Sequence, residues 1–208
     1  FILNNMGVVY ENQGKYKDAE KVRKHVLAVY EQTYGPDNPN VADAVSKLGS
    51  HYHALGRFTE ADAMFKRALA IQSRPDLDPV PAARTLNNMA ILQIDLGRFS
   101  EAEAQFRKAV EIEEKALGPS HPVVAEALQN LAATFKAQCR NEEAESLARR
   151  VIAIREKTLG PRHPDVASTL VNLGNLLVVD ERYADADPLY QRASSLPRPL
   201  SVGSIVLV

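Results

Sequence analysis

The sequence predicts an all-α protein built from successive antiparallel helix pairs, because two phrases recur along it at a fixed period. LGPSHPVVAEALQNLA (117–132) returns as LGPRHPDVASTLVNLG (159–174). Between such copies runs a second phrase, seen as GKYKDA, GRFTEA and GRFSEA, whose final residues are 42, 41, 42 and 42 positions apart, at Ala19, Ala61, Ala102, Ala144 and Ala186. A constant period indicates stacked units, since each unit buries its apolar face only against its neighbours.

The first half of each repeat is predicted to be a helix. In the fourth copy Leu128, Leu131, Ala132 and Phe135 fall at i, i+3, i+4 and i+7, which is one helix face. The third of these positions is always small, and we expect it to admit a closely packed neighbouring helix; it holds Gly7, Gly49, Ala90, Ala132 and Gly174. The predicted first helices cover about residues 1–13, 39–55, 79–96, 122–138 and 164–180.

The second half carries another helical stripe, such as Ala144, Leu147, Ala148 and Val151 in the fourth copy. We therefore expect Leu131 and this stripe in the core, and we expect truncation of Glu113 to cost little stability. The turn inside each pair has a glycine in the first three copies but Cys139 and Glu181 later, so it is not expected to require a positive φ. Prolines are predicted at the starts of first helices, where the missing N–H costs nothing; they are Pro39, Pro79, Pro122 and Pro164.

Composition argues against several classes of function. The chain has 25 basic and 26 acidic residues and a formal net charge of −1, so no excess positive field favours nucleic acid or an anionic membrane. No apolar run approaches the roughly 18 residues that a membrane helix needs. A single cysteine is compatible with a reducing compartment, and we expect a cytoplasmic location. The chain begins at Phe1, inside a repeat phrase, which favours a fragment of a longer protein.

The repeated phrases resemble the tetratricopeptide repeat, in the 42-residue version of kinesin light chains and kinesin-light-chain-like proteins. LNNMGVVYENQGKYKDAE (3–20), LNNMAILQIDLGRFSEAE (86–103), LGPSHPVVA and LGPRHPDVA carry the resemblance. It implies a right-handed superhelical solenoid of antiparallel helix pairs whose first helices line a concave, peptide-binding groove. Five repeats are predicted, followed by a non-repeat tail at 196–208; the repeats cover about 1–36, 37–76, 77–119, 120–161 and 162–195.

The resemblance also implies which residues face the groove. The candidate peptide-binding residues are Asn4, Ser46, Ser50, His53, Arg84, Asn87, Ile91, Ile94, Gln129, Lys136, Val171 and Asn175. Glu11, Asp43 and Glu126 are expected beside them. This mixed lining predicts a peptide with an apolar anchor over Ile91 and Ile94 and at most two acidic residues, because the groove carboxylates would repel a strongly acidic ligand. The first groove helix lacks the Lys and Asn of a peptide-carboxylate clamp and has Asn4 and Val8 instead.

Other short motifs are interpreted as structural. HPD (163–165) follows the repeat register, and HYH (51–53) is interpreted as a solvated or groove-facing pair because i and i+2 point to different sides of a helix. The recurring Asn5, Asn88, Asn130 and Asn172 are interpreted as polar links between helices. No nucleophile–base pair, metal-ligand cluster or phosphate loop appears in the sequence. We therefore expect no enzyme activity, no catalytic residues, no metal and no cofactor.

Two functions stay open at this point. One is a scaffold that binds a peptide segment of a partner protein, with adaptor or cargo-type recognition. The other is a sensor or regulatory arm of a larger multidomain enzyme or signalling protein. The apolar tail residues Ile205 to Val208 are expected to cover the exposed end of the last repeat, either their own or that of a second copy in a homodimer. The alternative is a disordered end or the stub of another domain.

Overall fold

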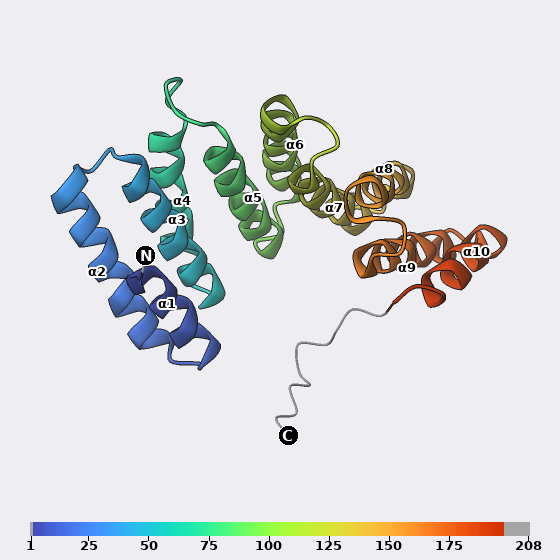
Figure 1. Cartoon of the computed structure of the whole chain (residues 1–208), viewed down its shortest axis with the longest axis horizontal. Coiled ribbons are helices and arrows are strands. Elements are labelled where there is room, and N and C mark those ends of the chain that lie inside the picture. Colours follow the sequence, from blue (N-terminus) through green and yellow to red (C-terminus); the bar gives the residue numbers. More distant parts are fainter. Residues whose placement is uncertain (1, 198–208) are drawn as a thin grey trace. The chain divides into compact units, whose positions relative to one another are not determined.

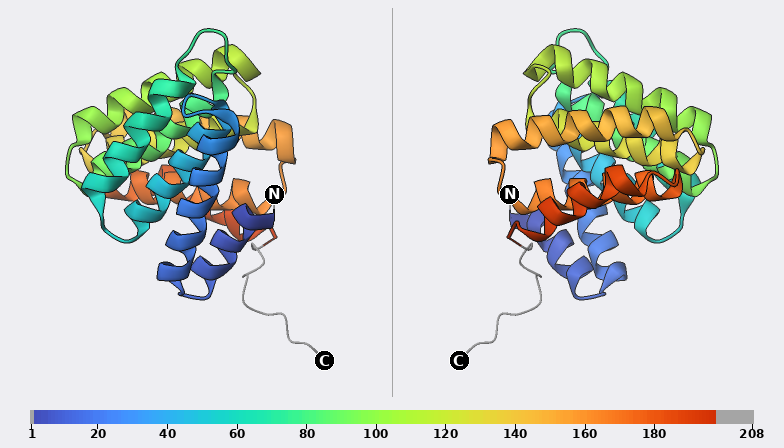
Figure 2. Two further views of the ribbon diagram at one scale, coloured as in Figure 1. Left: turned by 90° about the vertical axis from the view of Figure 1, so that its left-hand side faces the viewer. Right: turned by 90° about the vertical axis from the view of Figure 1, so that its right-hand side faces the viewer.

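The computed structural model describes the backbone of residues 2–197 and the side chains of residues 6–197. The described part is helical and contains no strand (Figure 1 and Figure 2). Its helices are α1 (Ile2–Asn12), α2 (Tyr16–Tyr34), α3 (Pro39–Ala54), α4 (Phe58–Gln72), α5 (Val80–Asp95), α6 (Phe99–Leu117), α7 (Pro122–Ala137), α8 (Asn141–Leu159), α9 (Pro164–Val179) and α10 (Tyr183–Ser194). The predicted ranges of the first helices are confirmed to within one residue.

The chain consists of two compact units, residues 1–116 and 117–208. In the first, α1 packs on α2 and α3 on α4, while α2 also contacts α3 and α4 contacts α5. Ala83 and Leu86 of α5 pack against Ala109 of α6. In the second, α7 packs on α8, α8 on α9, and α9 on α10. Each first helix therefore meets its own second helix, and that second helix meets the next first helix, within each unit.

Close approach inside a pair depends on the small residue of the first helix. A Cβ atom placed on Gly49 would lie 2.8 Å from the ring of Phe65, and one on Gly174 would lie 2.8 Å from the ring of Tyr190. Real Cβ atoms do not come so near to ring carbons, because the repulsion is too steep. The prediction that this position admits a closely packed neighbour is confirmed.

The turn inside each pair has a left-handed residue in every copy, so the prediction that it needs no positive φ is wrong. Cys139 and Glu181 both have φ of 58°, close to the 71° of Gly56. The same backbone bonds close these turns. The N–H of Cys139 donates to Lys136 at 3.0 Å, and that of Gly56 donates to His53 at 2.9 Å. The bonding pattern imposes the conformation, and a side chain at this position has to accept its strain.

The first helices begin with a cap that the repeated phrase supplies. Pro39, Pro122 and Pro164 are the first helical residues, and the side chain before each accepts a hydrogen bond from the helix backbone. At α9 the N–H of Asp165 donates to His163 Nδ1 at 3.2 Å. HPD is thus a helix start. At α5 the helix begins at Val80, one residue after the proline predicted to start it.

The core follows the predicted stripes with one correction. Leu131 is buried as expected, but Glu113 is only 2% exposed, so it lies in the core rather than at the exposed position that a small cost of truncation implies. Glu113 follows Phe106 by seven residues and Ala109 by four, which places it on the buried face of α6.

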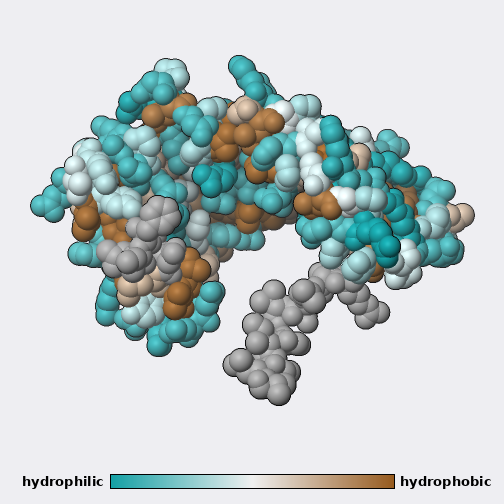
Figure 3. All heavy atoms as spheres, in the orientation of Figure 1, coloured by the Kyte–Doolittle hydropathy of each residue, from teal (hydrophilic) through white to brown (hydrophobic). Residues whose placement is uncertain are grey.

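The face drawn in Figure 3 is largely hydrophilic, with its hydrophobic residues in separate patches.

Candidate peptide-binding site

In the first unit, three predicted groove residues of α3 contact α5: Ser46, Ser50 and His53. The Ser46 hydroxyl oxygen lies 3.2 Å from that of Thr85, and His53 Nε2 lies 2.6 Å from an oxygen of Asp95. Thr85 is buried and donates onward to Gln72 at 2.7 Å. These side chains make polar contacts between neighbouring first helices, α3 and α5. A ligand on this face would therefore meet side chains that already have polar partners.

The recurring asparagines do not share one environment. Asn88 Nδ2 donates to the Ser50 hydroxyl at 3.5 Å, which is the inter-helix link that the sequence predicts. Asn130 is half-buried and Asn172 is exposed. The side chain of Asn5 lies outside the described residues, as does that of the predicted groove residue Asn4. The predicted polar link between helices is therefore observed for Asn88, between α3 and α5.

The predicted anchor of the first unit lies on one face of α5. Arg84 is exposed, while Asn87, Ile91 and Ile94 are half-buried. Their spacing of three, four and three residues keeps them on one side of the helix. The sequence predicts that Ile91 and Ile94 receive an apolar side chain of a peptide and that Arg84 lies near an acidic one.

Glu11, also predicted in the groove, is held by α2 and α3. Arg23 donates two hydrogen bonds to its carboxylate, at 2.9 and 2.7 Å, and His51 Nδ1 lies 2.6 Å from the same group. Burial alone would raise the pKa of Glu11, but the bonds from Arg23 and His51 outweigh it and hold that pKa below its usual value. His51 is fully buried, so its interpretation as a solvated or groove-facing residue is wrong.

Sequence reasoning missed this cluster although one signal was present. Arg23 stands four residues after the repeated Ala19, where the next copy has the buried Phe65. A cation at a core position needs a buried partner. Glu11 is that partner.

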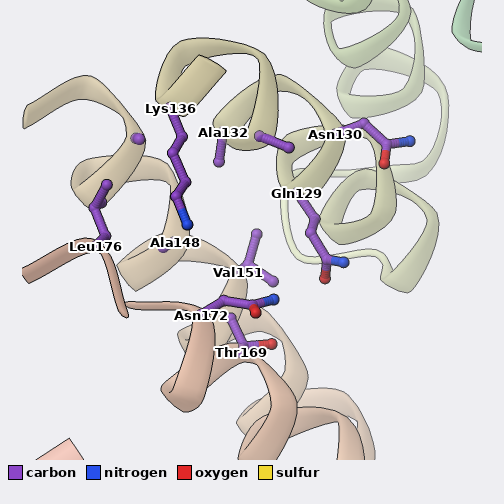
Figure 4. Close-up of a pocket in the computed structure, with 11 residues that line it drawn as sticks. Gln129, Asn130, Ala132, Lys136, Ala148, Val151, Thr169, Asn172 and Leu176 are labelled. Atoms are coloured by element: carbon purple, nitrogen blue, oxygen red, sulfur yellow. The ribbon is translucent and has the colours of Figure 1, made fainter. Parts of the chain in front are cut away.

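In the second unit, α7, α8 and α9 surround a pocket of about 230 Å³ (Figure 4). It is lined by Gln129, Asn130, Ala132, Ala133 and Lys136 of α7, by Ala144, Ala148 and Val151 of α8, and by Thr169, Asn172 and Leu176 of α9. The predicted groove residues Gln129 and Lys136 thus meet at one cavity. Gln129 Oε1 is buried and accepts no hydrogen bond from any residue that the structure describes.

The predicted groove residues of α9 lie beside α10. Asn175 accepts a 2.8 Å hydrogen bond from the Tyr190 hydroxyl. Val171 is exposed and borders a shallow hollow that also includes Leu196 and Pro197. The residues expected to cover this end, 205–208, lie outside the described part of the chain.

Within residues 2–197, no three His, Cys, Asp or Glu side chains are grouped closely enough to hold a metal ion. Over the same range, every helix is too short or too polar to cross a bilayer.

A family comparison agrees with the helix pairs. The family model described as tetratricopeptide repeat matches residues 1–74, 81–157 and 137–198. The chain belongs to the tetratricopeptide-repeat family. Tetratricopeptide repeats are generally non-catalytic scaffolds for protein–protein interaction. No curated protein sequence matches this tetratricopeptide-repeat chain.

Solved structures show the same fold. BtubC (BKLC) from P. vanneervenii has a TM-score of 0.83 and 22% identity, over 99% of this chain and 85% of that one. A Podosopora anserina putative kinesin light chain with nearly identical TPR-like repeats gives 0.77 and 22%, over 93% and 92%. The apo form of RapI gives 0.78 and 17%, over 92% and 68%. At these identities the likeness concerns the fold of the tetratricopeptide repeats.

Proposed function

We propose that this tetratricopeptide-repeat chain binds a peptide segment of a partner protein on the faces of its first helices, and that it performs no chemistry itself. The observation that carries the proposal is the pocket between α7 and α9, where the predicted groove residues Gln129 and Lys136 line one cavity. Amides beside an apolar floor suit a peptide, because the backbone needs hydrogen-bond partners and its side chains need apolar contacts.

The first unit offers a separate candidate contact on its α5 face. The peptide places an apolar side chain over Ile91 and Ile94 and an acidic residue near the exposed Arg84. A carboxylate beside Lys136 is accommodated in the same way. The ligand has few acids overall, since Asp43 and the exposed Glu126 also lie on first helices.

Affinity capture from a cell extract, followed by binding measurements with the captured partner, tests the proposal. Arg84→Ala and the double variant Ile91→Ala with Ile94→Ala should each weaken partner binding by about 1–3 kcal/mol, through the lost charged and apolar contacts. Arg162→Ala, which removes an exposed arginine from the turn before α9, is the matched control and should bind normally. Full capture by the α5 variants and by Lys136→Ala would place the binding surface elsewhere.

A further inference from the structure

The pocket between α7 and α9 exists because one repeat lacks a bulky side chain that the other repeats have. The position lies four residues after the repeated alanine of each second helix. It is occupied, in chain order, by Arg23, Phe65, Phe106, Ala148 and Tyr190. The fourth helix pair alone has a small residue there.

In three of the other pairs this side chain packs against the small residue of its first helix. The Phe65 ring is buried against Gly49, and the Tyr190 ring is packed against Gly174. Arg23 covers Gly7 in the same way, with its guanidinium carbon 3.3 Å from the place of an added Cβ. The space inside these pairs is therefore filled by the chain's own side chain.

In the α7–α8 pair the corresponding residues are Ala132 and Ala148, and both line the pocket. Ala144 and Val151 line it as well, so this part of the lining is apolar, and Thr169 adds a hydroxyl from α9. Gln129 of α7 and Asn172 of α9 add amide groups to the lining (Figure 4). The cavity combines a space that a ring fills in other pairs with amide groups in its lining.

We propose that this pocket receives a phenylalanine or tyrosine side chain of an extended partner peptide. The ring takes the place that Phe65 occupies in its own pair, and a peptide N–H donates to Gln129 Oε1, which is buried and unpartnered among the described residues. The inference rests on the proposed peptide-binding function and specifies its anchor. Residues 196–208 contain no aromatic residue, so the proposed ring comes from a partner.

Ala148→Phe should fill the pocket from inside. The third pair shows that the substitution can be accommodated, since Ala90 and Phe106 occupy the same two positions and are both fully buried. Ala153→Phe, at an exposed position of the same helix α8, is the matched control. Ala148→Leu fills less of the space and serves if the phenylalanine variant fails to fold.

The first measurement follows the methyl signals of Val151 and Leu176 by NMR while N-acetyl-L-phenylalanine amide is titrated into the whole chain. These signals should shift with the wild-type chain and the Ala153→Phe variant and stay in place with Ala148→Phe. N-acetyl-L-alanine amide should shift neither signal. Unmoved signals in the wild-type chain would overturn the ring-binding pocket.

The second measurement selects binders from a random peptide library on the wild-type chain. Selected peptides should share one Phe or Tyr and lose at least about tenfold in affinity for Ala148→Phe, with little change for Ala153→Phe. Equal binding to the wild-type and Ala148→Phe chains would overturn the pocket anchor and leave the proposed function standing. Failure to select any peptide would count against both. A change in solution mass on filling the pocket would identify a second copy as the occupant and overturn the proposal.

Discussion

The α3–α4–α5 region of the first unit and the α7–α8–α9 region of the second are built on the same repeat but differ in the space between their first helices. In the first region Phe65 fills the interior, and polar contacts such as His53 to Asp95 join α3 to α5. In the second region Ala148 stands in the ring's place, and a pocket opens between α7 and α9. A periodic pattern can therefore specify equivalent helices, while one side chain decides whether the space between them is filled or open as a pocket.

The largest loss of stability should come from removing the Phe65 ring, which fills the interior of the α3–α4–α5 region. Phe65→Ala should lower the free energy of unfolding by about 3–5 kcal/mol, because it removes a fully buried side chain and leaves a cavity. Denaturant unfolding measures the loss. Tyr183→Ala, at an exposed position, should change little. A loss below about 1 kcal/mol for Phe65→Ala would mean that the region collapses readily, contrary to a rigid filled interior.

Adding one methyl group against the same ring should have the next largest effect. Gly49→Ala places a Cβ 2.8 Å from the Phe65 ring, so we expect a destabilisation of about 1–3 kcal/mol from overpacking. Thermal unfolding of Gly49→Ala with and without Phe65→Leu checks the cause. The double variant should lose less than the sum of the two single variants. Strict additivity would show that the methyl group and the ring do not interact.

The stability contributed by the polar contacts that join α1, α2 and α3 should depend on pH. The pKa of Glu11 is below its usual value because the bonds from Arg23 and His51 outweigh burial. Its stabilisation is therefore complete above the ordinary glutamate pKa of about 4.3 and is lost as the pH falls through the lower folded value. Glu11→Gln should cost about 1–2 kcal/mol at neutral pH.

The measurement is chemical unfolding of the wild-type chain and Glu11→Gln across pH. The difference in free energy of unfolding between the wild type and Glu11→Gln should become smaller below about pH 4, because the wild-type carboxylate is then protonated and also uncharged. Glu111→Gln, an exposed position on α6, should stay close to the wild type throughout. A gap that is constant from neutral pH to about pH 3 would contradict the role of the ionised carboxylate.

The smallest effect should come from the turn between α7 and α8. Cys139→Gly removes a side chain from a left-handed residue, with φ of 58°, and should stabilise the chain by up to about 1 kcal/mol. Gly56→Ala makes the reverse change in the first unit, where φ is 71°. It should destabilise by a similar amount. Melting temperatures that shift in the same direction for both variants would refute a shared left-handed strain.

The sequence by itself determined the class of fold, the helix positions and the family. The reason is that the apolar stripe of a helix and the residues that start it lie close together in the sequence. The repeats contain these signals several times. Pro164 and the residue before it mark the start of α9 in any packing environment. The stripe also placed Leu131 in the core correctly. The assignment of groove residues, which came from the family resemblance, stays a prediction for Arg84 and Ile91.

Only the tertiary structure decided which of these positions meet, because the outcome depends on side chains from helices far apart in sequence. Ala148 belonged to a predicted core stripe, yet its environment is a pocket, since no neighbouring helix supplies the missing ring. His51 was interpreted as solvated, yet it is buried against Glu11 from α1. The turn at Cys139 was not expected to require a positive φ, yet its backbone hydrogen bonds hold that residue in the left-handed region. Local pattern specifies a helix face, but the volume and charge on the facing helix decide what that face becomes.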